Sequence, residues 1–175
     1  MDAVMEGRAT SPGEHADPAP RPEGPVRVYL LDDHELVRRG LSELLSTEEG
    51  IEVVGDSGSA TEAARRIPAL RPHVAILDAR LPDGSGIDVC REIRSKDPTI
   101  KVIILTSYDD EEALLSAIMA GASGYVLKEV RGTALVDGIR RVARGESLLH
   151  SADVEHVLER LKAGPRDIED RKSVV

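Results

Sequence analysis

The stretch His73-Val-Ala-Ile-Leu-Asp78 decides the fold of this chain. Its run of Val, Ala, Ile and Leu has no polar alternation, which is typical of a parallel strand covered by helices on both faces. The turn-rich segment 79–86 follows at once, so Asp78 stands where the chain leaves the sheet. Ligands of open α/β sheets bind at the carboxyl ends of the strands, and Asp78 is therefore the first candidate site residue.

Apolar runs and amphipathic segments alternate on both sides of this strand. Further strands are predicted at 26–31, 51–54, 101–106 and 125–128. Helices are predicted at 35–46, 87–95, 109–120 and 133–144. The spacing of Ser59 and Glu62 is that of a capping box and predicts one more helix start. Strand and helix alternate five times, which predicts an α/β fold with a doubly wound parallel sheet.

Three segments are expected along the chain. Residues 1–25 are rich in Pro, Gly, Ala, Glu and Asp without periodicity, a composition that predicts a disordered tail. Residues 26–146 contain all five strand–helix units and are expected to form one domain. Residues 147–175 are expected to form a linker helix, at 151–162, and a tail, because only 151–162 carries a stripe of apolar residues.

Composition and charge exclude several classes of function. The 32 acidic residues outnumber the 23 basic ones, so the net charge of −9 disfavours nucleic-acid binding by this chain alone. Cys90 is the single cysteine, which excludes an intramolecular disulfide and is interpreted as a small core residue. The sequence shows neither a secretion signal nor a run of about 18 apolar residues, so we expect a cytoplasmic protein without membrane contact.

Polar residues stand at the ends of four predicted strands. Asp32 and Asp33 follow the first strand, Asp78 ends the third, Thr106 the fourth and Lys128 the fifth. Neighbouring strands lie about 4.8 Å apart, so these side chains are expected in one shallow pocket. Two like charges about 4 Å apart repel by about 4 kcal/mol at the dielectric constant of a protein surface, so three acids favour a bound cation. A set of carboxylate ligands predicts Mg²⁺, with Mn²⁺ as the alternative.

From about Val26 to Arg144 the chain resembles the receiver domain of two-component response regulators. The motifs that carry the resemblance are Leu31-Asp-Asp-His34, Leu77-Asp78, Leu81-Pro-Asp-Gly84, Leu105-Thr-Ser107 and Gly124-Tyr-Val-Leu-Lys128. They are similar to those of the NarL/FixJ, or LuxR-type, family, and especially of its actinobacterial DevR/DosR branch. The resemblance implies a CheY-like, flavodoxin-type fold with strand order 2-1-3-4-5 and five flanking helices.

The resemblance also implies a chemical role for each acidic residue. Asp78 would be the phosphoacceptor, a carboxylate nucleophile that takes a phosphoryl group from a histidine kinase. Asp33 and Asp78 would hold Mg²⁺ together with the main-chain carbonyl of Arg80, and Asp32 would act through a bound water. The ion would neutralise phosphoryl charge during in-line transfer.

The resemblance implies that the remaining motif residues contact the phosphoryl group or respond to it. Lys128 would pair with one phosphoryl oxygen, and the Thr106 hydroxyl would hydrogen-bond another. Tyr125 would move inward as Thr106 moves, and so remodel the surface formed by the fourth helix, fifth strand and fifth helix. Chemistry is expected to be limited to self-phosphorylation and autodephosphorylation, so the chain is not expected to be an enzyme in the ordinary sense.

The expected partners follow from the same resemblance. A sensor histidine kinase would donate the phosphoryl group, and a homodimer would form through helices 4 and 5 or through the linker helix. NarL-type regulators continue into a helix-turn-helix domain, and the residues after Gly164 are too few for one. DNA would therefore be bound only through a missing output domain of a transcriptional regulator.

Two alternatives to the receiver hypothesis stay open. A haloacid-dehalogenase-like Mg²⁺ phosphatase also uses an Asp nucleophile on a doubly wound sheet. That chemistry needs Asp-x-Asp at one strand end, which neither Leu31-Asp-Asp-His34 nor Leu77-Asp-Ala-Arg80 supplies. The second alternative is a pseudo-receiver that acts only as a binding scaffold, and the complete set of site residues disfavours it.

Three smaller interpretations concern single elements. The predicted fourth helix, 109–120, is apolar nearly all round, which indicates either deep burial or an interface. His34 is interpreted as a solvent-exposed residue at a helix start rather than a metal ligand. Asp83 is assigned to a turn.

Overall fold

The computed structural model describes residues 23–107, 111–129 and 132–149, together with Glu155, Glu159 and Lys162. Its main sheet has five parallel strands in the order β2-β1-β3-β6-β7, which confirms the predicted order of the first to fifth strands. The strands are β1 (Val26–Leu31), β2 (Ile51–Ser57), β3 (Val74–Asp78), β6 (Lys101–Thr106) and β7 (Gly124–Leu127).

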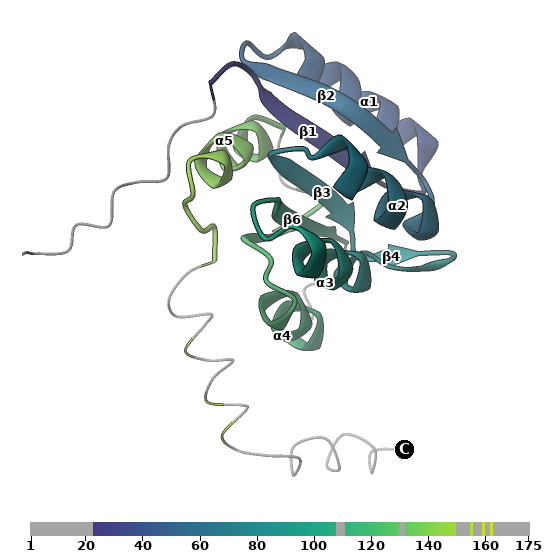
Figure 1. Ribbon diagram of the computed structural model, residues 1–175, viewed down its shortest axis with the longest axis vertical. Coiled ribbons are helices and arrows are strands. Elements are labelled where there is room, and N and C mark those ends of the chain that lie inside the picture. The colour runs from purple at the N-terminus through teal and green to yellow at the C-terminus, as the bar shows by residue number, and fades with distance from the viewer. Residues whose placement is uncertain are drawn as a thin grey trace, which may run out of the picture.

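Helices cover both faces of the sheet, as the doubly wound prediction requires. Two of them, α1 (Glu35–Thr47) and α5 (Gly132–Ala143), pack with one set of strand side chains. The other three are α2 (Ala60–Leu70), α3 (Gly86–Lys96) and α4 (Glu111–Met119). They pack with the opposite set, and Figure 1 shows them in succession along one side of the sheet.

The core is aliphatic and divides at the sheet. In β1, Val28 and Leu30 face α1 and α5, whereas Tyr29 and Leu31 face α2 and α3, because successive side chains of a strand point to opposite faces. All five residues of β3 are buried, which confirms a strand covered on both faces. Cys90 is fully buried and its burial raises the pKa of the thiol to about 11, so it is the core residue that was expected.

The segment after Asp78 differs from the predicted loop. It forms a small antiparallel ribbon of β4 (Arg80–Leu81) and β5 (Gly84–Ser85), which Figure 1 shows projecting beside the main sheet. Each strand has only two residues, too few to produce an alternating pattern in the sequence. In the main sheet, β2 runs three residues beyond its predicted end at Val54, as far as Ser57.

Of the two interpretations of the fourth helix, deep burial and an interface, the structure does not support deep burial. Ala117 is the only residue of α4 that is buried, Leu114 and Leu115 are half-buried, and the Met119 side chain is 66% exposed. The helix contacts α3, beside which Figure 1 shows it, and its apolar residues are only partly covered.

The predicted ends of the chain fall mostly outside the described residues. Of the predicted tail, only 23–25 are described, and of the predicted linker helix only Glu155, Glu159 and Lys162, which are helical and exposed. Both segments and the domain boundaries stay predictions. Within the described part of the chain, no helix combines the length and the apolar character that a membrane span needs.

Candidate functional site

The acidic residues predicted to converge do so at the carboxyl edge of the sheet. Asp32 and Asp33 follow β1, and Asp78 ends the adjacent strand β3. Each of these carboxylates offers an oxygen, and His34 a ring nitrogen, such that all four atoms lie within 4.8 Å of one another. The geometric expectation is thus met, since parallel neighbours place their ends on one edge.

Lys128 reaches the acids from the end of the edge strand β7, two strands from β3. Its Nζ lies 2.8 Å from Asp78 Oδ2 and 3.2 Å from Asp32 Oδ2. The backbone N–H of Lys128 donates to the Thr106 carbonyl at 2.7 Å, which holds the residue at the end of β7. Only 17% of the Lys128 side chain is exposed, so the ammonium contacts these carboxylates with little access to water.

The electrostatics of Asp78 and Lys128 reflect burial and mutual contact. Burial raises the pKa of Asp78, and although hydrogen bonds from Lys128 and from the Arg80 N–H lower it, the net change is upward. Burial would lower the pKa of Lys128, but the carboxylates of Asp78 and Asp32 outweigh burial and raise it. Lys128 therefore stays a cation at neutral pH.

Two carboxylate oxygens of Asp32 and Asp33 are available to bind a cation. Asp32 is 3% exposed, and its Oδ1 accepts hydrogen bonds from the backbone N–H of His34. Among the described residues, Asp32 Oδ2 contacts the Lys128 ammonium and Asp33 Oδ1 contacts the His34 ring, and neither oxygen has a further partner. Buried carboxylate oxygens with so few partners, next to a third carboxylate, fit a hard divalent ion.

His34 occupies the helix start that the sequence predicted. It is the N-cap residue of α1, and its side chain is 64% exposed. The ring also lies beside the acids, with Nδ1 3.1 Å from Asp32 Oδ1 and 3.3 Å from Asp33 Oδ1. The sequence did not predict this contact. His34 was interpreted as a helix-start residue, because no other histidine has the spacing of a second metal ligand.

The loop after Asp78 is packed tightly against it. The backbone N–H of Arg80 donates to Asp78 Oδ1 at 3.2 Å, so the main chain of Arg80 lies at the site. A Cβ at Gly86 would fall on the Asp78 carbonyl oxygen and within 2.9 Å of the carbonyl carbon. Only glycine at 86 permits this close return of the chain.

Asp83 has a structural role that the sequence reading missed. Its carboxylate accepts hydrogen bonds from the Ser59 hydroxyl at 2.7 Å, the Ala60 N–H at 2.9 Å and the Thr61 N–H at 3.2 Å. Ser59 itself caps α2 by accepting from the Glu62 N–H, as predicted. These bonds hold the pKa of Asp83 far below its usual range. No local pattern reveals a cap supplied from 22 to 24 residues away.

The two predicted switch residues lie on one face of the sheet. Thr106 ends β6 and is 3% exposed, and β6 pairs with β7 so that Thr106 is opposite Leu127. Tyr125 is half-buried and packs on the cluster that contains Ile104. Thr106 follows Ile104 by two positions and so points to that same face.

Comparison with known proteins defines the class of this fold and site. The profile of the response regulator receiver domain matches residues 28–140. The chain belongs to the response regulator receiver domain family, and is thus a receiver of a two-component system.

The relatives narrow this assignment to the NarL/FixJ, or LuxR-type, regulators. The chain is 49% identical over 137 residues to the DNA-binding transcriptional activator DevR/DosR of Mycobacterium tuberculosis, an alignment that covers 78% of this chain and 63% of that protein. It is 34% identical to the response regulator protein VraR of Staphylococcus aureus, covering 78% and 66%. The chain thus spans less than two thirds of the length of these curated relatives.

Solved structures agree with the fold. The signal receiver domain of the putative response regulator NarL from M. tuberculosis superimposes with a TM-score of 0.68 at 32% identity, covering 70% of this chain and 99% of that chain. The isolated REC domain of RcsB from Salmonella enterica serovar Typhimurium, determined with the phosphomimetic BeF₃⁻, gives a TM-score of 0.66 at 26% identity, covering 77% and 99%.

Proposed function

We propose that this receiver is a phosphorylation-dependent switch that accepts a phosphoryl group on Asp78 from a histidine kinase. The observation that carries the proposal is the position of Asp78. Its buried carboxylate lies 2.8 Å from the Lys128 ammonium and beside the acid pair Asp32 and Asp33. A carboxylate that is both desolvated and held by a cation suits nucleophilic attack on a charged phosphoryl group.

The transfer itself is a simple displacement. A carboxylate oxygen of Asp78 forms a bond to phosphorus as the bond from phosphorus to the kinase imidazole breaks, and the imidazole leaves with the bonding pair and takes a proton from water. The product is an acyl phosphate. Lys128, which stays protonated at neutral pH, exchanges part of its contact with Asp78 for a phosphoryl oxygen, and the Thr106 hydroxyl hydrogen-bonds another.

Asp33, Asp78 and the main-chain carbonyl of Arg80 would hold Mg²⁺, and Asp32 would contribute through a bound water. Mn²⁺ is the alternative, since it accepts the same oxygen ligands. When bound, the ion neutralises charge on the phosphoryl oxygens. The support for this ligand set is the pair of buried carboxylate oxygens Asp32 Oδ2 and Asp33 Oδ1. Among the described residues, each has a single contact, with the Lys128 ammonium and the His34 ring respectively.

Phosphorylation is proposed to be read at the face formed by α4, β7 and α5. Thr106 and Tyr125 lie on the side of the sheet that α4 covers, so a movement of Thr106 towards the phosphoryl group frees space for the Tyr125 ring. Homodimers would form through this face or through the linker helix. The exposed Met119 side chain supports an interface on α4.

The switch would control transcription in the cytoplasm, with DNA bound by an output domain of a transcriptional regulator. The description of DevR/DosR as a DNA-binding transcriptional activator supports this part of the proposal. The chain would catalyse only its own phosphorylation and autodephosphorylation.

The deciding experiment is phosphotransfer followed by intact mass. The wild-type chain is incubated with acetyl phosphate and Mg²⁺, and we expect it to gain one phosphoryl group, whereas Asp78→Asn gains none. Asp88→Asn is the matched control and should label like wild type, because Asp88 is an exposed residue of α3 whose ion-pair partner in the described part of the chain is Arg91. Labelling of Asp78→Asn would contradict the proposal, and turnover of a small phosphate ester by wild type would favour the dehalogenase-like phosphatase instead.

A further inference from the structure

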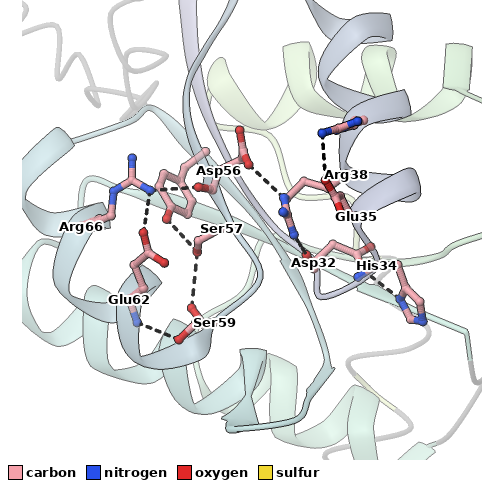
Figure 2. Close-up of polar contacts among 11 residues, drawn as sticks. Asp32, His34, Glu35, Arg38, Asp56, Ser57, Ser59, Glu62 and Arg66 are labelled. Carbon is pink, nitrogen blue, oxygen red and sulfur yellow. Dashed lines mark hydrogen bonds and ion pairs between the residues drawn. The ribbon is translucent and has the colours of Figure 1, made fainter.

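Arg38, in the first turn of α1, joins the acid pair to the end of β2. Its Nη1 donates to the main-chain carbonyl of Asp32 at 2.6 Å, and its Nε donates to Asp56 Oδ1 at 2.9 Å, as Figure 2 shows. The Arg38 side chain is 20% exposed. The next residue, Arg39, is 72% exposed, and among the residues that the structure describes its ion-pair partner is Glu35 on the helix surface.

The main chain of Asp32 is held on two sides as a result. Its N–H donates to the Ser57 carbonyl at 3.1 Å, and its carbonyl accepts from Arg38. Both contacts lead to the end of β2, directly at Ser57 and through the guanidinium at Asp56. Asp33 directly follows Asp32 in the chain. The contacts therefore also fix the backbone position from which the Asp33 side chain extends.

The anchor at the end of β2 is itself held in place. Arg66 of α2 donates to the Asp56 carbonyl at 2.9 Å, and the Tyr29 hydroxyl donates to Ser57 Oγ at 2.9 Å. Figure 2 shows these contacts as a continuous network beside Asp32. Arg38 therefore connects the acid pair to a braced part of the sheet rather than to a free loop.

The sequence leaves room for this guanidinium. A Cβ at Gly58 would lie 2.9 Å from Arg38 Nη1 and 3.5 Å from the Asp32 carbonyl oxygen. Any larger side chain at Gly58 would push Arg38 away from the carbonyl. The contact thus depends on Arg38 in α1 and on Gly58 in the bend between β2 and α2.

We propose that Arg38 is a positioning residue for the divalent ion, acting through the main chain of Asp32. Three carboxylates repel one another, and a loop free to relax would move the acids of 32–33 away from Asp78. The bridge opposes that movement, because one planar guanidinium donates in two fixed directions at once. This inference rests on the proposed metal site and adds a residue that touches neither the ion nor the phosphoryl group.

Coulomb's law alone makes the opposite prediction, which is what makes the inference testable. Removing a positive charge near a cation site should strengthen binding of the cation. Positioning predicts that loss of Arg38 weakens it. A loss of affinity in Arg38→Gln therefore reports on geometry and not on charge.

The experiment measures Mn²⁺ binding by electron paramagnetic resonance and Mg²⁺ binding by calorimetry, with thermal unfolding recorded for each variant. Arg38→Gln is expected to lower the affinity for both ions about 10-fold or more. This is the range found when a residue that orients metal ligands is removed. Arg39→Gln, with the same change in charge, is expected to bind as wild type or slightly tighter. Arg38→Lys should not rescue, because an ammonium cannot make the same two-directional contact.

A further variant keeps the test valid if Arg38→Gln folds poorly. Gly58→Ala displaces the guanidinium without removing it and without any change in charge. It should also weaken the binding of Mn²⁺. Wild-type affinity in Gly58→Ala and in Arg38→Gln would overturn the inference, as would an equal loss in Arg39→Gln. Absence of Mn²⁺ and Mg²⁺ binding by wild type would instead refute the proposed metal site itself.

Discussion

Lys128 and Asp78 are 50 residues apart in the sequence, and their charged groups lie 2.8 Å apart at the sheet edge. The pair joins the end of β7 to the end of β3 across the intervening strand β6. The pKa of Asp78 is nevertheless raised. Burial raises it by more than the hydrogen bonds from Lys128 and from the Arg80 N–H lower it. The site thus holds a charge that the fold would be more stable without.

Asp78→Asn should therefore raise the thermal stability of the metal-free chain at pH 7. We expect a rise in Tm of about 2–4 °C, the shift that about 1 kcal/mol gives in a chain of this size. The sign follows from linkage: a carboxyl whose folded pKa is raised destabilises the fold once ionised, and this cost disappears as pH falls through the folded pKa.

Calorimetric melts of wild type and Asp78→Asn between pH 7 and pH 4 test this prediction. The difference in Tm should shrink as pH falls. A variant that is less stable than wild type at pH 7, or a difference that does not change with pH, would contradict it.

Asp83 should show the opposite dependence on pH. Its folded pKa is depressed by hydrogen bonds from Ala60, Ser59 and Thr61, so its carboxylate stabilises the fold above the usual aspartate pKa. That stabilisation is lost as pH falls through the lower, folded pKa. Asp83→Asn should lower the urea concentration at half-unfolding by a few tenths of 1 M at pH 7. Below pH 7, the stability of the variant should fall less steeply with decreasing pH than that of wild type.

Urea titrations at pH 7, 5 and 3 would measure this effect. Asp88→Asn serves as control, since the ion-pair partner of the exposed Asp88 in the described part of the chain is Arg91, and the substitution should leave the midpoint unchanged. Equal behaviour of the two variants would show that the cap on α2 contributes nothing.

Gly86→Ala should destabilise the chain by about 1–3 kcal/mol, as expected when an atom is forced into a packed site. The new methyl group would meet the carbonyl of Asp78, the proposed phosphoacceptor. Phosphorylation by acetyl phosphate should slow as well, because the Asp78 backbone must shift.

Gly40→Ala is the matched substitution for Gly86→Ala. Gly40 lies inside α1, and a Cβ there meets nothing within 4 Å. Alanine should stabilise the helix by about 0.5–1 kcal/mol. Urea unfolding of both variants tests the pair, and a neutral Gly86→Ala would show that the close return of the chain after Asp78 is not required.

Met119→Asp should lower self-association if α4 forms the proposed dimer face. The Met119 side chain is 66% exposed, so an aspartate there can be solvated without disturbing the core. Sedimentation of the beryllofluoride-treated chain should show a dimer for wild type and an association weakened at least about 10-fold for the variant. Glu112→Gln, on the exposed first turn of α4, is the control. An unchanged mass for Met119→Asp would remove α4 from the interface.

The sequence by itself determined the order of the strands and helices and the residues at their ends. Apolar runs such as that before Asp78 are local features and can be found in the sequence alone. Because the carboxyl ends of parallel strands share one edge, five positions far apart in the sequence were predicted to lie in one pocket. The same reasoning could not separate burial from exposure for α4, because apolar composition does not say whether a neighbouring element covers it.

Only the tertiary structure decided which side chains hold the site in place. Asp83 caps a helix that begins more than 20 residues earlier, and Arg38 reaches a carbonyl of Asp32 and a carboxylate on β2. Such contacts depend on directions and distances between elements, and hydrogen bonds between distant residues leave no periodic trace in a sequence. Residue types and spacing therefore predicted the candidate reactive groups, whereas only the packed structure shows which residues contact and support them.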